Sequence, residues 1–450
     1  MPKSFTTPLP SPISIHIDSP ALARQHCRPQ SLLYRKSCIE HKLPRHHMPF
    51  SDISALSHPK RPLRVAMLCY CFYEVDNRVR RYAETLVRRG DTVDVISLRR
   101  NGQSHYEELN GVRIFKVQER VRDEKGRLDY LRRIIKFVLK SAFLLTRKHL
   151  SLPYDLIHVH SVPDFEVFAA IMPKLSGAPV ILDIHDIVPE LYASKFKLRK
   201  NSVAFKFLVL LEKASIAFSD HVIISNDLWR KRLISRSVSR EKCTAILNYP
   251  DDRLFHRSGR LNKNGERIVL MYPGTLNHHQ GLDIAINAFS TINHKLPNAK
   301  LIIYGEGPAK ECLADLIRKY GLEKQVFLYN QVPLHEIARI MAEADIGVIP
   351  KRNDDFGGEA FSTKSLEFMI LGVPIIVSRT LVDQFYFNES IVKFFDPGNV
   401  ENLAAVMLEM AQDKVLRDRL SAGGIEFLKK NSWSAKENMY LDIVESLVVK

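Results

Sequence analysis

The chain alternates between short apolar runs and longer segments of helical periodicity, and it begins this alternation twice. At the first start, an apolar run at 65–69 precedes a helical pattern at 79–89, then Gly90, then a second apolar run at 92–96. Strand, helix, glycine and strand in this order are typical of a βαβ unit. The other strand-like runs lie at 156–159, 180–183, 221–225, 268–272, 300–304, 326–328, 346–349 and 374–377, and helical patterns between them include 283–289 and 334–342. Two successive series predict an α/β protein with two Rossmann-like, doubly wound domains that face a central cleft.

The segments outside the two series differ in composition. Residues 1–60 hold nine of the 23 prolines and six of the 17 histidines, which predicts a disordered basic, Pro-rich tail. The tail lacks the apolar core of a secretory signal, while a transit peptide and translation from Met48 both stay open. The polar segment 251–265 is expected to be the hinge between the domains.

The charge of the chain points to an anionic partner. Sixty-six Lys and Arg against fifty Asp and Glu give a net charge of +16, which suits nucleic acid, a phosphorylated metabolite or an acidic membrane. No apolar run reaches the roughly 18 residues of a membrane-spanning helix. Six scattered cysteines do not form a disulfide framework, and we therefore expect a reduced, cytoplasmic protein.

A basic helix is expected within residues 127–150, which contain seven Lys or Arg and one acid. Arg132, Lys136 and Lys140 fall four apart and form a basic edge. An apolar face beside this edge is predicted from Leu131, Ile134, Ile135, Val138, Ala142 and Leu145. Such a helix can lie on an anionic membrane or can simply pack with a solvated face, and both readings stay open. A second basic cluster lies at 195–200.

The segment 346–377 has the strongest local pattern. A strand ends at Pro350, a glycine-containing loop follows, and Ser362 or Thr363 is expected to cap a helix that reaches about Leu371. The free N–H groups of such a helix start favour an anion, and Lys364 adds a positive charge there.

Glu359 in this loop and Glu367 on this helix, separated by seven residues and followed by Gly-x-Pro at 372–374, resemble the signature of retaining glycosyltransferase family 4, the group 1 glycosyltransferases. The resemblance extends over about residues 64–445, with similar motifs at 78–90, 155–160, 183–186, 272–276, 304–308 and 432–433. It implies a GT-B fold with an acceptor domain at 61–255, a donor domain at 256–432 and a C-terminal helix at 433–450 that crosses back to the first domain.

The resemblance also implies an activity, which is transfer of a sugar from a nucleotide sugar to a lipid-linked or polysaccharide-precursor acceptor with retention of configuration. No cofactor and no metal are expected, because Asp354 and Asp355 lack the spacing of an Asp-x-Asp motif. The expected partners are the donor, the acceptor and an anionic membrane surface reached through 127–150 and 195–200, without nucleic acid. The enzyme would then be cytoplasmic or peripheral on the inner face of the membrane.

Residue roles follow from the same resemblance. The catalytic residues would be His185, Glu359 and Lys364, with Glu359 on the sugar hydroxyls. Glu367 would bind the ribose, because a carboxylate can accept one hydrogen bond from each hydroxyl of a diol. The donor-binding set would be completed by Gly274, Thr275, His278, His279, Gly305, Phe361, Ser362 and Thr363.

One departure from the family pattern concerns the diphosphate. Members usually carry Arg and Lys after the first strand of the second domain, where this chain has Thr275 and Gln280. The charge that grows on the leaving group needs stabilising, and Lys364, His278 and His279 are the nearby candidates.

Three alternatives stay open at this point. A GT-B hydrolase or epimerase would use the nucleotide sugar without an acceptor. A nucleic-acid-binding protein would explain the charge, although no aromatic residues interleave with the basic runs. A non-catalytic sugar-binding protein would keep the fold alone.

Overall fold

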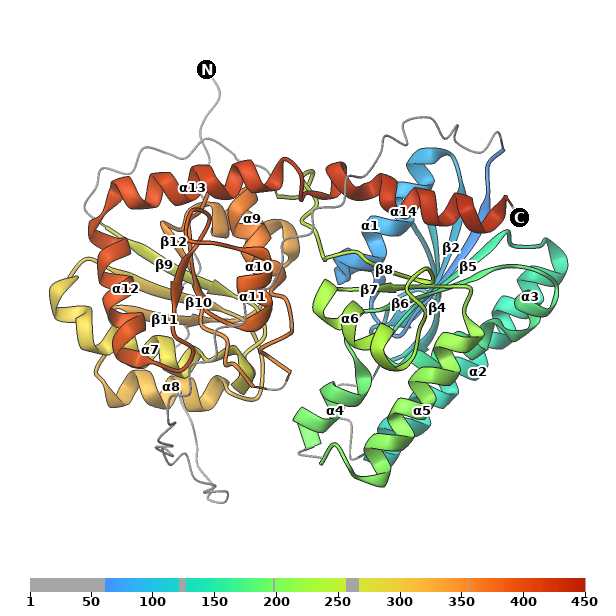
Figure 1. Ribbon diagram of the computed structural model, residues 1–450, viewed down its shortest axis with the longest axis horizontal. Coiled ribbons are helices and arrows are strands. Elements are labelled where there is room, and N and C mark those ends of the chain that lie inside the picture. The colour runs from blue at the N-terminus through green and yellow to red at the C-terminus, as the bar shows by residue number, and fades with distance from the viewer. Residues whose placement is uncertain (1–60, 121–126, 197–198, 256–266, 355, 450) are drawn as a thin grey trace. The chain divides into compact units, whose positions relative to one another are not determined.

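The computed structural model describes residues 61–120, 127–196, 199–255, 267–354 and 356–449. The expected tail and most of the expected hinge at 251–265 lie outside these residues. The described chain forms two sheets with helices on both faces, coloured blue to green and yellow to red in Figure 1. This is the predicted α/β architecture with two Rossmann-like domains. The domain boundaries stay predictions.

The first sheet has eight strands in the order β3-β4-β2-β1-β5-β6-β7-β8. All neighbouring pairs are parallel except β3 with β4, which are antiparallel and joined by a tight turn at Asn110 and Gly111, both at positive φ. The five expected strands are confirmed, whereas β3, β4 and β8 were not predicted. The strands are β1 (Arg64–Cys69), β2 (Thr92–Arg99), β3 (Tyr106–Leu109), β4 (Val112–Glu119), β5 (Leu156–His160), β6 (Val180–Ile184), β7 (His221–Ile224) and β8 (Cys243–Ala245).

Helices cover both faces of this sheet because its crossovers run in two directions from β1. Strand β1 shows the division: Val65 and Met67 pack into the core under α1, while Ala66 and Leu68 pack into the core under α2, α5 and α6. Helix α1 begins where the Asp76 side chain accepts hydrogen bonds from two backbone N–H groups. The helices are α1 (Asn77–Arg89), α2 (Arg127–Ser151), the 3₁₀ segment η2 (Asp164–Ala170), α3 (Ile171–Leu175), α4 (Val188–Phe196), α5 (Val203–Phe218) and α6 (Asp227–Arg236).

Helix α2 corrects one sequence prediction. The six apolar residues do not share one face: Ile134 and Leu145 are buried against the sheet, whereas Leu131 and Ile135 are exposed. The helix therefore has two apolar sides, and helical periodicity alone could not tell which of them is buried. The predicted basic edge of Arg132, Lys136 and Lys140 is exposed, as are Arg199 and Lys200 of the second basic cluster, while Lys195 and Lys197 lie outside the described side chains.

The second sheet has six parallel strands in the order β11-β10-β9-β12-β13-β14. Its five expected strands are confirmed, and so are the helices expected at 283–289 and 334–342. The strands are β9 (Val269–Pro273), β10 (Lys300–Tyr304), β11 (Val326–Tyr329), β12 (Ile346–Ile349), β13 (Ile375–Ser378) and β14 (Lys393–Phe395). The helices are α7 (Leu282–Ile292), α8 (Lys310–Lys319), α9 (Leu334–Ala342), α10 (Thr363–Ile370), α11 (Leu381–Tyr386), α12 (Val400–Gln412) and α13 (Lys414–Leu428).

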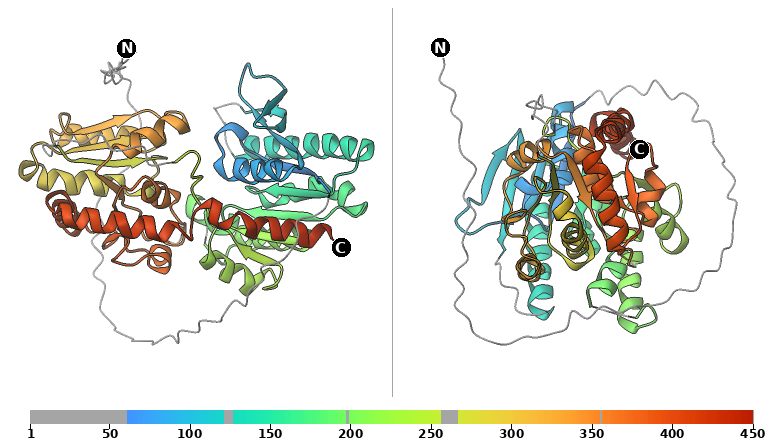
Figure 2. Two further views of the ribbon diagram at one scale, coloured as in Figure 1. Left: turned by 90° about the horizontal axis from the view of Figure 1, so that it is seen from above. Right: turned by 90° about the vertical axis from the view of Figure 1, so that its left-hand side faces the viewer.

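The last helix, α14 (Trp433–Val448), packs on α1 and β5 of the first sheet, as its deep red ribbon shows in Figures 1 and 2. The Trp433 indole donates to Thr85 Oγ1 at 2.9 Å, and Tyr440 Oη lies 3.0 Å from His158 Nδ1. Both contacts are buried, and they fix the helix to the first sheet.

Candidate functional site

The first group of site residues lies where β5 and β6 end. Their register pairs His160 with Asp183, and His185 follows β6 directly. Asp183 Oδ2 lies 3.1 Å from His160 Nδ1 and 3.1 Å from His185 Nε2, and Arg78 donates two hydrogen bonds to the same carboxylate at 2.6 and 2.8 Å. Burial by itself would raise the pKa of Asp183, but Arg78 and the two histidines outweigh it and hold that pKa well below its ordinary value.

His185 is the predicted site residue of this group, and it is the member that reaches the surface. About a fifth of its side chain is exposed (21%), while His160 and Asp183 are fully buried. Its backbone is fixed by Ser225, whose hydroxyl donates to the His185 carbonyl at 2.7 Å. His185 is therefore a fixed imidazole at the carboxyl edge of the sheet, where ligands of such folds bind.

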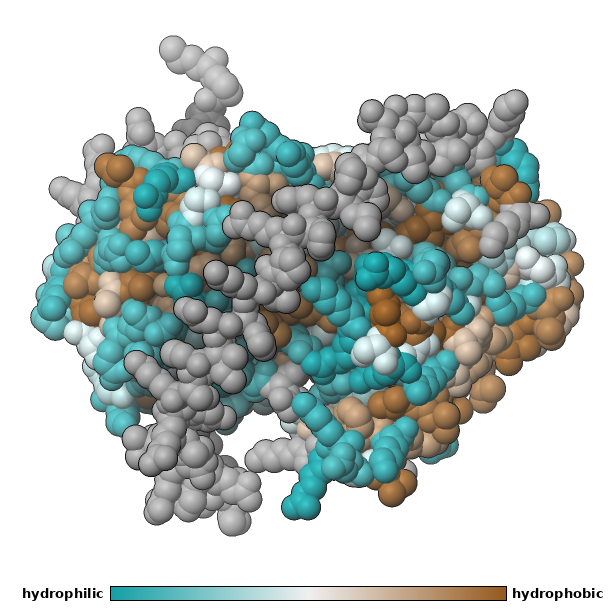
Figure 3. Space-filling model, viewed as in Figure 1, coloured by the Kyte–Doolittle hydropathy of each residue, from teal (hydrophilic) through white to brown (hydrophobic). Residues whose placement is uncertain are grey.

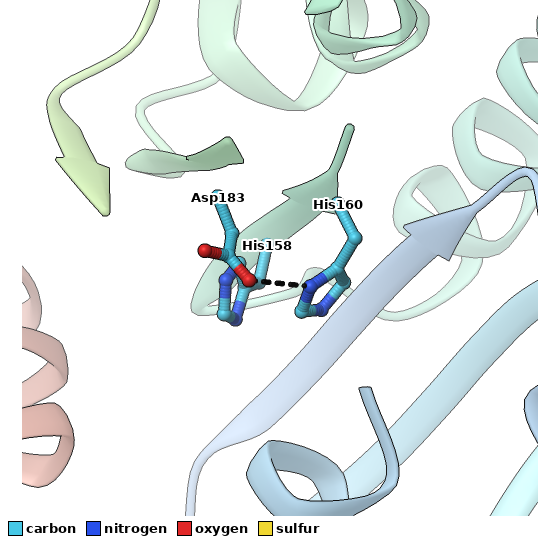
Figure 4. A group of neighbouring side chains, drawn as sticks. All are labelled: His158, His160 and Asp183. Carbon is cyan, nitrogen blue, oxygen red and sulfur yellow. Dashed lines mark hydrogen bonds and ion pairs between the residues drawn. The ribbon is translucent and has the colours of Figure 1, made fainter. Parts of the chain in front are cut away.

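Figure 4 shows a possible metal-ligand set, with His158, His160 and Asp183 turned toward one another. It is the one group of at least three such side chains found among the described residues. Arg78 already bonds to both oxygens of Asp183, so a metal ion would face a fixed guanidinium at its only anionic ligand. The donor set fits a hydrogen-bonded cluster better than a cation site.

Glu359 lies in a turn that neighbouring side chains hold in place. Asp354 accepts from the N–H groups of Phe356 and Gly357, and the Lys351 ammonium donates to the Ala360 carbonyl at 2.7 Å. One oxygen of Glu359 is paired with Arg232 of α6, and the other is buried without a hydrogen-bond partner in the described structure. One oxygen of this carboxylate is thus without a hydrogen bond in the described structure.

The start of α10 departs from its prediction in one detail. Ser362 is the N-cap residue, as expected, but its side chain makes no capping hydrogen bond. The hydroxyl oxygens of Ser362 and Ser365 are both buried, and neither has a hydrogen-bond partner in the described chain. Two hydroxyl groups at a helix start that favours an anion therefore lack a hydrogen-bond partner.

Lys364 lies directly against the turn after β9. Gly274 has a φ of 139°, and a Cβ atom built on it would be 2.0 Å from Lys364 Cε and 2.7 Å from Nζ. The ammonium lies 5.6 Å from the centre of the Tyr272 ring and makes no ion pair within the described residues. Burial lowers the pKa of Lys364, and the charge of Glu367 offsets this only in part.

Gly305 belongs to the same place for a steric reason. A Cβ atom at Gly305 would be 1.8 Å from the Gly274 carbonyl oxygen, which is backbone and cannot rotate away. The turns after β9 and β10 therefore touch through two glycines, and the Lys364 side chain lies against the first of them, Gly274.

Glu367 lines a cavity of about 240 Å³ together with Thr363. Other walls of the cavity come from Arg78 and Arg81 of α1 and from Tyr249. Burial raises the pKa of Glu367, while Lys364 and a hydrogen bond from Thr363 oppose that shift. A half-buried carboxylate at a cavity of this size can bind a diol.

The remaining predicted residues lie around this centre with different roles. Thr275 and His278 are exposed, and burial lowers the pKa of His279, which favours its neutral form at pH 7. The Phe361 ring packs against the rings of Tyr386 and Phe387, so its side chain contributes to packing.

Sequence reasoning missed two cations of the site, Arg232 and Lys351. Arg232 looks like a solvated residue of a helix, and its partner Glu359 is 127 residues away. Lys351 forms a buried pair with Asp383 at 2.9 Å. Its position two residues after the end of the strand β12 was the one available signal.

Comparisons with known proteins show the family and the fold of the chain. Residues 75–248 match the family Glycosyl transferase 4-like domain, and residues 256–427 match the family Glycosyl transferases group 1. A curated relative, the 2-deoxystreptamine N-acetyl-D-glucosaminyltransferase of Niallia circulans, is 25% identical over 272 residues, which is 56% of this chain and 65% of that protein. The match thus spans just under two thirds of this relative.

Solved structures show the same fold. Sucrose-phosphate synthase from Thermosynechococcus elongatus superposes with a TM-score of 0.70 at 17% identity, over 86% of this chain and 99% of that one. Anabaena Alr3699/HepE, solved in complex with UDP-glucose, gives 0.64 at 15% identity, over 85% and 100%. None of the described helices is long and apolar enough to cross a membrane. The paired glutamates, the two matched families and the two sheets together establish that the chain belongs to the group 1 glycosyltransferases and has their GT-B fold.

Proposed function

We propose that this glycosyltransferase transfers a sugar from a nucleoside diphosphate sugar to a saccharide or lipid-linked acceptor, with retention of configuration. The observation that carries the proposal is the Lys364 ammonium, which is half-buried, lies on the Gly274 turn and has no ion-pair partner in the described structure. A charge that is costly to bury needs an anion, and a diphosphate supplies one.

The groups around Lys364 support the same ligand. The free hydroxyls of Ser362 and Ser365 lie at the start of α10, where backbone N–H groups favour phosphate oxygens. Glu367 lies on the same helix, three residues after Lys364, and would accept hydrogen bonds from the ribose. The Anabaena protein was solved with UDP-glucose, which supports a nucleotide sugar as the donor.

The reaction can be written with the groups present. The acceptor oxygen forms a bond to the anomeric carbon on the face from which the nucleoside diphosphate leaves, and the acceptor proton passes to the departing phosphate oxygen. Lys364 stabilises the negative charge that grows on this phosphate. In this proposal Glu359 holds the sugar hydroxyls through its unpaired oxygen, and His185 lines the acceptor side.

This step requires no metal ion, because Lys364 and the helix start supply the positive potential. We therefore expect turnover to be unchanged by a chelator. The net charge of +16 supports an anionic setting for the acceptor, such as the inner face of a membrane.

A thermal shift screen of the full chain across nucleoside diphosphate sugars tests the donor. A ligand that binds the native state raises the melting temperature, and the shift at the same ligand concentration should be smaller in Lys364→Met. No shift with any nucleotide sugar would refute the proposal. Donor consumption that is independent of an added acceptor would instead indicate a hydrolase, and the anomeric configuration of the product, read by NMR, tests retention.

A further inference from the structure

The outer side of α2 exposes a continuous row of large apolar side chains. Leu131, Ile135, Leu139 and Phe143 repeat every four residues and are 44%, 45%, 65% and 71% exposed. The opposite side of the same helix is already buried against the sheet through Ile134, Phe137 and Leu145. The exposed row therefore has no role in the core of the domain.

Helix α5 exposes a second row on the same face of the sheet. Val203, Phe207 and Leu210 are 84%, 61% and 63% exposed, at the spacing of one helix side. Both helices pack against η2, which lies between them. Figure 3 shows hydrophobic surface at the right and lower right, where Figure 1 places α2, α3 and α5. Isolated exposed apolar residues are common, but two neighbouring rows form a patch that is typical of an interaction surface.

Basic side chains border both rows. Arg132 and Lys136 on α2, and Lys206 and Lys213 on α5, are exposed and have no ion-pair partner within the described residues. The acids of these two helices do not neutralise them, because Asp129 is paired with Arg133 and Glu212 is buried against Arg236. The patch is thus apolar in the middle and cationic at its border.

The two helices begin near the edge of the sheet that holds His185. The first half of α2 is anchored by a small core in which Ile134 and Phe137 pack with Tyr70, directly after β1, and with Leu98 near the end of β2. Helix α5 ends two residues before β7 begins, so its start also points toward the carboxyl edge. With 25 residues, α2 is about 37 Å long. The five residues of β5 span about 17 Å, so α2 is longer than this strand of the sheet that it covers.

We propose that the outer sides of α2 and α5 form a docking surface for an anionic lipid bilayer. Apolar side chains enter the interface between headgroups and acyl chains, while the basic border binds anionic headgroups. A second copy of the chain fits less well, because its own basic border would be repelled. The bilayer would then lie beside the edge that holds His185, where a lipid-linked acceptor can enter. The proposal names the membrane partner that the proposed function leaves open, and its test does not depend on turnover.

Sedimentation of the full chain with vesicles of phosphatidylcholine, with and without phosphatidylglycerol, tests the docking surface. One variant removes apolar area (Leu139→Ser, Phe143→Ser, Phe207→Ser and Leu210→Ser). A second removes charge (Arg132→Gln, Lys136→Gln, Lys206→Gln and Lys213→Gln). The matched control changes four exposed basic residues of the second sheet's half of the chain to Gln, namely Lys295, Lys324, Arg419 and Lys430.

We expect the parent and the control to sediment with phosphatidylglycerol vesicles, and added salt to weaken this binding. Removing one basic side chain should weaken vesicle binding about fivefold. The four changes of the charge variant together should weaken vesicle binding by about several hundredfold. The apolar variant should also lose binding. All variants should keep the parent's melting temperature, because the changed side chains are exposed.

Three results would overturn the proposal. The parent could fail to sediment with either vesicle, or both variants could sediment like the parent. The parent could also be a dimer that the apolar variant dissociates while vesicle binding stays unchanged, which would assign the patch to a second copy of the chain.

Discussion

Replacing Lys364 by Met should separate stability from activity in this enzyme. Methionine keeps most of the stem that covers Gly274 and removes only the charge. Because burial lowers the pKa of Lys364, the charged ammonium is less favourable in the folded enzyme than in the unfolded chain. We therefore expect the melting temperature of Lys364→Met to equal or exceed that of the parent at neutral pH.

The sign of the pH dependence follows from the same shift. The folded pKa is below the ordinary value of 10.5, so the unfolded chain binds the proton more tightly. The penalty for the parent is complete below the folded pKa and disappears as the pH rises from that pKa toward 10.5. Any advantage of Lys364→Met should therefore be largest near neutrality and should shrink at alkaline pH.

Activity should change in the opposite direction. Removing one preorganised group that stabilises charge in the transition state costs about 10²–10³ in turnover. Loss of a charged hydrogen bond to the diphosphate, at about 1.5–3 kcal/mol, corresponds to about 10- to 150-fold weaker binding of the nucleoside diphosphate.

Steady-state kinetics, calorimetric binding of the diphosphate and melting curves across pH measure all three effects, with Lys324→Met on an exposed lysine as the control. The reasoning fails if Lys364→Met turns over like the parent. It also fails if the variant loses stability at neutral pH, since that would mean that the ammonium has a partner in the fold.

Three further predictions concern neighbouring contacts. Glu367→Gln should raise the donor KM by about 10- to 150-fold with little change in kcat, because the ribose is remote from the breaking bond. Since burial raises the pKa of Glu367, the parent should lose donor affinity on acidification at a higher pH than an exposed glutamate would, and Glu367→Gln should lack this loss. Gly274→Ala should lower both the melting temperature and turnover: its φ of 139° strains alanine by about 1–3 kcal/mol, and the new Cβ displaces Lys364. Thr85→Val should cost about 1–3 kcal/mol in urea unfolding, because it leaves the buried Trp433 N–H without its acceptor, and no effect would mean that α14 is held by packing alone.

The strands that could be predicted from the sequence are those buried on both faces. Such strands are nearly continuous apolar runs, like 65–69 or 346–349, and the ends of each were predicted to within three residues. The strands β3 and β4 were missed because neither is a continuous apolar run: β3 is mostly exposed, and β4 buries only every second residue. The signal was nevertheless present, since Asn110 and Gly111 form the two-residue turn that is typical of a hairpin.

The site could be predicted only where a motif names its residues. The spacing of Glu359 and Glu367 carried the resemblance to the family, and that resemblance singled out both carboxylates and His185, whose roles stay predictions. Contacts over long sequence separations could not be predicted. The distance between Gly274 and Lys364, and the pair of Arg232 with Glu359, depend on how separate strands and helices pack.

Ion pairing is the property that distinguishes the cations around the proposed diphosphate site. Lys351 is paired with Asp383, and Arg232 is shared between Glu190 and Glu359, so their charges are already compensated within the protein. Lys364 has the Tyr272 ring beside it and no carboxylate in ion-pair contact among the described residues. In the sequence all three are equivalent basic residues, because whether a carboxylate compensates a positive charge depends on the distance between the two groups in the folded protein. If Thr275 and Gln280 stand where relatives keep cations, Lys364 is the charge that remains available to a leaving phosphate, which is why its replacement is the most direct test of the proposed chemistry.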